Sequence, residues 1–219
     1  CLDPSPEAME FAAEKGCSVL VSHHPLIFSP LKKLDVSTGT GKAVAFALKR
    51  NIAVISMHTN WDSSPRGVNA AIAAALGLES VSALVPSLSG AWGLGALGDV
   101  PSALTGRELG QRILSVLNLS RLDLYGDPHR PVNRLALCGG SGGSLWSEAK
   151  AAGADAFFTS DLKYHERMDS LASGLVLFAG DHGEVESFSL DAMARVVSEA
   201  FGFEPPIFRT MPAIPVIIG

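Results

Sequence analysis

Two adjacent histidines, His23 and His24, follow the apolar run at 17–22, which is typical of a buried strand opening into a loop. Imidazole nitrogen is a common ligand of first-row divalent metals. Successive side chains of a strand point to opposite faces, so these two rings would not easily chelate one ion together. The pair therefore predicts two metals, or one ligand with a supporting partner, and Pro25 fits the end of the strand. The alternative is a pair of hydrogen-bonded histidines in the core.

Two further pairs of potential ligands follow apolar runs in the same way: His58 with Asp62, and His182 with Glu186. His182 and Glu186 are four positions apart, so both side chains would project from one face of a helix and could hold one centre. Without thiolates, this set suits zinc, manganese, iron or another first-row divalent metal. The alternatives are a solvated His/Glu surface pair, and a helix cap or core partner in the case of His58 or Asp62.

Asp161, Lys163 and His165 follow another apolar run. A carboxylate, an ammonium and an imidazole at the end of one strand could bind a phosphate or shuttle protons. Equally, Asp161 could cap a helix and Lys163 could be solvated. The glycine segment 139–143 could present backbone N–H groups to an anion, but it lacks both the Walker sequence and GxGxxG, and a plain tight turn is the simpler interpretation.

Helix and strand patterns alternate along almost the whole chain, and they must position these residues. Strands are predicted at 17–22, 52–57, 121–134 (with a turn), 135–138, 155–160, 174–179 and 216–218, and short strands with bends at 81–100. Helices are predicted from Ser5 to Gly16, at 41–50, from Ser64 to Gly77, after the capping box Thr105–Glu108, at 145–152, and as one long helix up to Phe201. The strands are continuous apolar runs, typical of sheets covered on both faces, so the fold class is α/β. Polar residues follow five of these strands, in the segments 23–24, 58–62, 139–143, 161–165 and 182–186. If the strands run parallel, these five segments could converge at the carboxyl ends of the strands.

The composition favours a globular protein without a membrane segment. Of 219 residues, 47% are hydrophobic and 18% are charged, which suits one compact α/β unit or two small intimate lobes. No apolar run approaches the roughly 20 residues that cross a bilayer, and we expect no membrane partner and a cytoplasmic location. Three cysteines without CxxC spacing predict neither disulfides nor a thiolate metal site. The net charge of −5 disfavours nucleic acid as a partner. The chain begins at Cys1, directly before a predicted helix, so we expect that further N-terminal sequence precedes it.

The ordered set SHHPLIF, HTNWD, GGSGG, SDLKYH and DHGEVE resembles the GTP cyclohydrolase 1 type 2 homologues, a family of dinuclear-metal proteins, over nearly the whole chain. The resemblance implies two divalent ions per subunit in a shared site. The family's metal positions fall on five residues of this sequence: His23, His24, Asp62, His182 and Glu186. Glu186 would bridge the ions. His58, Asp161 and His165 match positions that line the same cavity.

The chain also departs from this family in two places. Asp181-His182-Gly183 replaces the usual Gly-His-Tyr, which keeps the ligand and removes an aromatic ring. Between Val100 and Asn133 there is too little chain for the inserted domain of longer members, so residues 1–219 resemble the short form, with a single family domain. The resemblance implies two related, intertwined α/β lobes with mixed sheets covered by helices, a metal site at the strand ends, and a toroidal homohexamer.

Two functional hypotheses follow. The first is a metal-dependent hydrolase of a small-molecule substrate, such as a nucleotide or a phosphoester, with His58, His165 and Asp161 as catalytic candidates. The second is a non-catalytic metal-binding hexamer that acts as a scaffold, a regulatory protein or a metal chaperone. Five protein ligands shared by two ions leave each ion open, which favours chemistry, because structural sites are closed.

Overall fold

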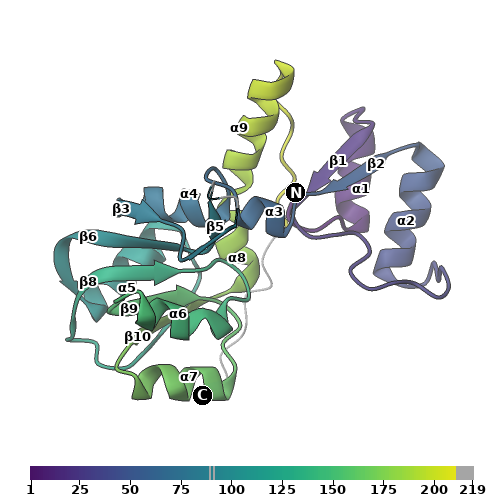
Figure 1. Cartoon of the computed structure of the whole chain (residues 1–219). Helices are drawn as coiled ribbons and strands as arrows, with labels where there is room; N and C mark the ends of the chain where they lie inside the picture. Colours follow the sequence, from purple (N-terminus) through teal and green to yellow (C-terminus); the bar gives the residue numbers. More distant parts are fainter. Residues whose placement is uncertain (89, 91, 211–219) are drawn as a thin grey trace. The chain divides into compact units, whose positions relative to one another are not determined.

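A computed structural model of the chain describes residues 1–88, 90 and 92–210, and these form two units (Figure 1). One unit comprises residues 1–61 and 193–210, and the other comprises residues 62–192. Each unit combines strands with helices, which confirms the predicted α/β class. The strand predicted at 216–218 lies outside the described residues.

The first unit is built around two parallel strands joined by a helix. Its elements are α1 (Pro6–Glu14), β1 (Val19–Ser22), α2 (Gly39–Arg50) and β2 (Ala53–Ser56). The register of the strands runs from Val19 opposite Ala53 to Ser22 opposite Ser56. Helix α1 begins as predicted, because the Ser5 hydroxyl accepts the N–H of Ala8. Both predicted strands are confirmed, each with slightly shorter bounds.

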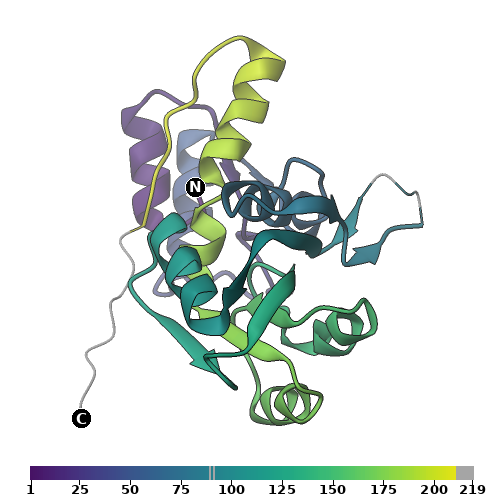
Figure 2. The same cartoon turned by 90° about the vertical axis from the view of Figure 1, so that its left-hand side faces the viewer.

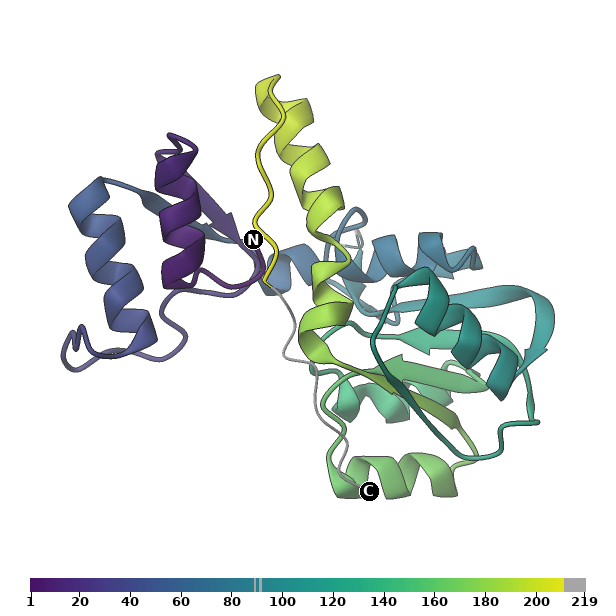
Figure 3. The ribbon, with the colours of Figure 1, turned by 180° about the vertical axis from the view of Figure 1, so that it is seen from behind.

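Helices α1 and α2 lie side by side and cover one face of this small sheet (Figure 3). Their shared core is made of small and aliphatic side chains: Ala8, Met9, Ala12, Leu20, Ala43, Ala47 and Ile52. On the opposite face, Val19 is 45% exposed and Ile55 is 51% exposed. The continuous apolar sequence of the strands predicted a sheet that helices cover on both faces. In this unit α1 and α2 cover one face, and the other carries the exposed side chains.

A six-stranded mixed sheet forms the second unit, in the order β3-β6-β8-β9-β10-β7. The strands are β3 (Glu79–Ser82), β6 (Ala96–Thr105), β7 (Leu122–Tyr125), β8 (Pro131–Leu137), β9 (Ala156–Thr159) and β10 (Val176–Gly180), and a separate short pair is β4 (Val85–Pro86) with β5 (Gly93–Leu94). Strands β8, β9 and β10 are parallel, whereas β3, β6 and β7 pair antiparallel with their neighbours. Three of the five predicted polar segments, those that follow β8, β9 and β10, therefore leave the same end of this sheet, whereas the other two follow β1 and β2 of the small sheet.

Helices cover both faces of the large sheet (Figure 2). The helical elements of this part of the chain are α4 (Val68–Ala75), α5 (Gly106–Val116), the short η1 (Gly143–Leu145), α6 (Trp146–Ala151), α7 (Tyr164–Ala172), α8 (His182–Ser187) and the start of α9 (Leu190–Phe201). Phe157 and Leu177 pack with α6 on one face. On the other face α5 approaches Phe178 so closely that a Cβ on Gly110 would lie 3.1 Å from its ring. Both faces are thus buried, which explains the apolar strand sequences.

Two predicted helices have different bounds. The helix expected from Ser64 begins only at Val68, because Ser64 closes a turn with the N–H of Gly67, and a four-residue helix, α3 (Thr59–Asp62), precedes it. The long helix expected up to Phe201 is two helices, α8 and α9. The N–H and the hydroxyl of Ser189 both donate to the carbonyl oxygen of Glu186, which ends α8.

Among residues 1–88, 90 and 92–210, the helices are all too short or too polar to cross a bilayer.

Candidate metal centre

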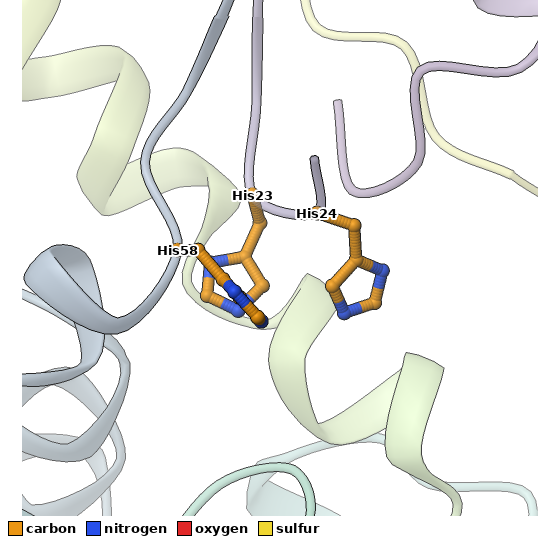
Figure 4. Close-up of side chains that lie close together, drawn as sticks. All are labelled: His23, His24 and His58. Carbon is orange, nitrogen blue, oxygen red and sulfur yellow. The ribbon is translucent and has the colours of Figure 1, made fainter. Parts of the chain in front are cut away.

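Three imidazoles of the first unit lie together at the ends of β1 and β2 (Figure 4). Strand β1 ends at Ser22, so the alternation that we expected to separate His23 from His24 does not apply, and their ring centroids are 5.1 Å apart. His58 follows β2, and its ring lies 5.2 Å from that of His23 and 5.8 Å from that of His24. One ring nitrogen from each of the three lies within 4.8 Å of the others. Three donors of one chemical type therefore converge, and His23 is only 1% exposed.

Neighbouring groups fix the orientation of two of these rings. His23 Nδ1 lies 2.9 Å from the carbonyl oxygen of Met57. A carbonyl can only accept a hydrogen bond, so Nδ1 carries the proton and Nε2 is the nitrogen suited to a metal. His24 Nδ1 lies 2.7 Å from Asp3 Oδ1, an arrangement common behind metal-binding histidines. Sequence reasoning missed Asp3, because a separation of 21 residues carries no local signal.

The second unit brings together Asp62, His182 and Glu186. Helix α8 begins at His182, with Asp181 as its N-cap, so the spacing of four places both side chains on one face as predicted. His182 Nε2 lies 2.9 Å from Glu186 Oε2. A carboxylate oxygen of Asp62, the last residue of α3, lies within 4.8 Å of one on Glu186. Asp62 is 9% exposed and Glu186 is 4% exposed. Two carboxylates this close and this buried form an environment that favours a cation.

Asp161 supports His182 from the other side. Its Oδ2 lies 2.6 Å from His182 Nδ1, and its backbone has the left-handed φ of 49°. Hydrogen bonding to Glu186 first, and to Asp161 second, raises the pKa of His182 to about 9 despite partial burial. The alternative of Asp161 as a helix cap does not hold, because Lys163 occupies the N-cap of α7. Asp161 instead orients His182.

The glycine loop accommodates a carboxylate. Gly140 has φ 69°, and a Cβ there would overlap with Glu186 Oε1. Within the loop, the N–H of Gly142 donates to Thr159 Oγ1, and the Gly140 carbonyl accepts from the Thr159 hydroxyl and from the Ser160 N–H. The loop is therefore hydrogen-bonded to the end of β9 and lies against Glu186.

His165 and Cys138 lie in contrasting environments, one exposed and one buried. His165 is exposed on α7, where its ring packs edge-on against Tyr164 at 5.2 Å. No group of three or more potential ligands among the described residues includes Asp161 or His165. Burial, followed by the charges of Asp62 and Glu186, raises the pKa of the Cys138 thiol to about 12, so this thiol is neutral.

Comparison with known proteins decides the family. Residues 1–210 match the profile of Duf34/NIF3 (NGG1p interacting factor 3). The chain belongs to the Duf34/NIF3 family. A relative of this Duf34/NIF3 chain, the GTP cyclohydrolase 1 type 2 homolog of Streptomyces coelicolor, is 37% identical over 191 residues, which cover 84% of this chain and 67% of the relative. The resemblance inferred from the motifs is confirmed.

Solved structures agree with the fold of this Duf34/NIF3 chain. Staphylococcus aureus protein SA1388 superposes with a TM-score of 0.86 at 26% identity, over 92% of this chain and 79% of that one. A Bacillus cereus protein related to NIF3 has a TM-score of 0.88 at 21% identity, over 100% of this chain and 88% of that one. The mixed α/β architecture is thus shared.

The donor set of this Duf34/NIF3 chain fits a divalent ion. The first unit offers imidazole nitrogens, and the second offers an imidazole with two buried carboxylates. Such a mixture of nitrogen and oxygen donors, without thiolate, suits zinc, manganese or iron.

Proposed function

We propose that this chain binds two divalent metal ions through His23, His24, Asp62, His182 and Glu186 and hydrolyses a nucleotide or another phosphoester. The observation that carries the proposal is the convergence of three imidazoles on nitrogens within 4.8 Å of one another, in two loops that follow parallel strands. Imidazoles gathered in this way lose side-chain entropy, and a cation bound by His23 and His24, with His58 beside it, is the simplest compensation.

Divalent ions would supply Lewis-acid chemistry and activate a water molecule for attack. The residues of the chain have separate tasks in the proposal. Met57 and Asp3 bond to Nδ1 of His23 and His24, respectively, which leaves Nε2 of each ring available as a metal ligand. His58, whose ring is beside both, carries a proton to the leaving group. Asp161 keeps His182 in one orientation through Nδ1, and His165 on α7 is a second candidate proton carrier.

The substrate class rests on the relatives. Several carry the name GTP cyclohydrolase 1 type 2 homolog, which points to a purine nucleotide, and the ligand types suit phosphoesters in general. We further propose a homohexameric assembly, as the resemblance to this family implies.

The test begins with the metal content of anaerobically purified protein. The mass of the assembly is then measured on the same sample. Turnover of GTP and of a panel of phosphoesters is measured last, with and without chelator. We expect two ions per chain, a mass six times that of the chain, and turnover that the chelator abolishes. Two ions without turnover would move the assignment to a non-catalytic metal-binding scaffold. Absence of bound metal would reject the ligand set.

Substitutions separate the ligands from the proton carriers. Glu186→Ala should lose the metal, whereas His165→Ala should keep it and reduce only turnover. Glu184→Ala is the matched control, because Glu184 lies on the same helix and its carboxylate binds the N–H of Ser120. Equal metal loss in Glu186→Ala and His165→Ala would refute this division of roles.

A further inference from the structure

A buried amide connects α3, which ends at Asp62, with the glycine loop that lies against the carboxylate of Glu186. Asn69 lies in α4, whose other seven residues are alanines, a valine and an isoleucine, and it is 0% exposed. Its Nδ2 donates to the carbonyl oxygen of Asp62 at 3.0 Å. Its Oδ1 accepts the N–H of Gly139 at 2.8 Å.

The two partners require a side chain that offers both a hydrogen-bond donor and an acceptor. A carbonyl oxygen only accepts and a backbone N–H only donates, so the bridging group must offer one donor and one acceptor, as the side chain of Asn69 does. Asp62 ends α3, where a carbonyl lacks a helical partner, and Gly139 follows the end of β8. Loss of the amide would leave two buried polar groups unsatisfied, which is costly.

The hydrogen bond to Gly139 links Asn69 to the glycine loop that lies against the carboxylate of Glu186. Gly140, the next residue, has left-handed backbone and touches the carboxylate of Glu186 so closely that a Cβ would overlap with Oε1. A Cβ on Gly139 would in turn lie 2.6 Å from Val68 Cγ1, so α4 packs directly on the loop. Asn69 is therefore hydrogen-bonded to Asp62 itself and to Gly139, the neighbour of the glycine that limits the position of the Glu186 carboxylate.

We infer that Asn69 is a positioning residue that sets the distance between the carboxylates of Asp62 and Glu186 and so tunes the affinity of the metal centre. This inference rests on the proposed metal-binding function. Groups that orient metal ligands without touching the ion typically change metal affinity about 10- to 100-fold when they are removed.

The experiment compares Mn²⁺ binding by the full chain, by Asn69→Leu and by Ser170→Ala, with titration calorimetry and the Mn²⁺ EPR spectrum as readouts. Ser170 is equally buried, and its hydroxyl bonds the Glu166 carbonyl within α7, so its loss removes a buried hydrogen bond elsewhere in the same unit. We expect Asn69→Leu to weaken Mn²⁺ binding about tenfold or more and to change the spectrum, and Ser170→Ala to change neither. Asn69→Ser, whose hydroxyl is too short to span both partners, replaces Asn69→Leu if that variant does not fold.

The outcomes separate this inference from the function on which it rests. Failure of the unsubstituted chain to bind Mn²⁺, Zn²⁺ or Fe²⁺ would overturn both. Normal binding by the Asn69 variants, with binding by the unsubstituted chain intact, would overturn the positioning role alone. Equal weakening in the Asn69 and Ser170 variants would also overturn it, because the effect would then be one of general stability.

Discussion

Gly140 limits where the carboxylate of Glu186 can lie. A Cβ there would overlap with the end of that flexible side chain, which could move aside at little cost in stability. We therefore expect Gly140→Ala to displace the carboxylate and to weaken Mn²⁺ binding about tenfold or more in titration calorimetry. The left-handed backbone should also cost this alanine roughly 1–2 kcal/mol in the free energy of unfolding.

Gly153→Ala is the matched control, since Gly153 has φ 78° and a Cβ there would meet nothing within 4 Å. Both variants should lose similar stability in urea unfolding, and only Gly140→Ala should lose affinity for the metal. If both variants bound Mn²⁺ as the unsubstituted chain does, Glu186 would not be held at Gly140.

Spacing in the sequence predicted the candidate ligands that lie close together in the chain. It did not predict the residues that hydrogen-bond to those ligands from distant positions. The adjacent histidines and the His182–Glu186 pair are visible because they share one loop or one helix turn. Asp3 and Asn69 act across 21 and 70 residues, and no period links such positions. An asparagine inside an otherwise apolar helix was the available signal for Asn69, because a buried amide needs partners.

At the scale of elements, the start of α8 determines how His182 and Glu186 are presented. The carboxylate of Asp181 accepts the N–H of Glu184 at 3.0 Å and caps the helix. Asp181→Ala should cost about 1 kcal/mol in the free energy of unfolding and should weaken Mn²⁺ binding, because the first turn carries His182. Asp181→Asn should preserve both, since asparagine caps helices equally well.

Ser5→Ala tests whether the loss of any cap has this effect. Ser5 caps α1 in the first unit, where its hydroxyl accepts the N–H of Ala8 at 3.2 Å. Its removal should lower stability to a similar extent and leave Mn²⁺ affinity unchanged. If Asp181→Asn lost affinity as Asp181→Ala does, the charge of Asp181 rather than its capping hydrogen bond would be responsible.

The elements themselves were largely predictable, because their signals are local. Ser5 and the capping box at Thr105 mark helix starts, and the structure confirms both. The break between α8 and α9 was missed, since the hydrogen bonds of Ser189 to the Glu186 carbonyl depend on the folded turn. The antiparallel pairing of β6 with β8 also has no local signal, because pairing partners are set by the whole sheet.

At the scale of the whole molecule, the proposed ligands come from both units, so metal binding should stabilise both. A ligand present at 100 times its dissociation constant adds about 2.7 kcal/mol to the free energy of unfolding of the part that binds it. Hydrogen exchange followed by mass spectrometry measures this gain separately for peptides from residues 1–61 and from residues 62–192. We expect saturating Mn²⁺ to slow exchange in both sets of peptides, and a chelator to reverse the effect.

Glu186→Ala provides the control for this measurement, because its loss should remove the metal-dependent protection from both sets of peptides. The reason is that Glu186 belongs to the proposed ligand set, and an incomplete set would hold the metal more weakly. Protection confined to residues 1–61 would assign the metal to His23, His24 and His58 alone. That result would make His58 a ligand rather than a proton carrier and would leave Asp62, His182 and Glu186 as a cluster without an ion.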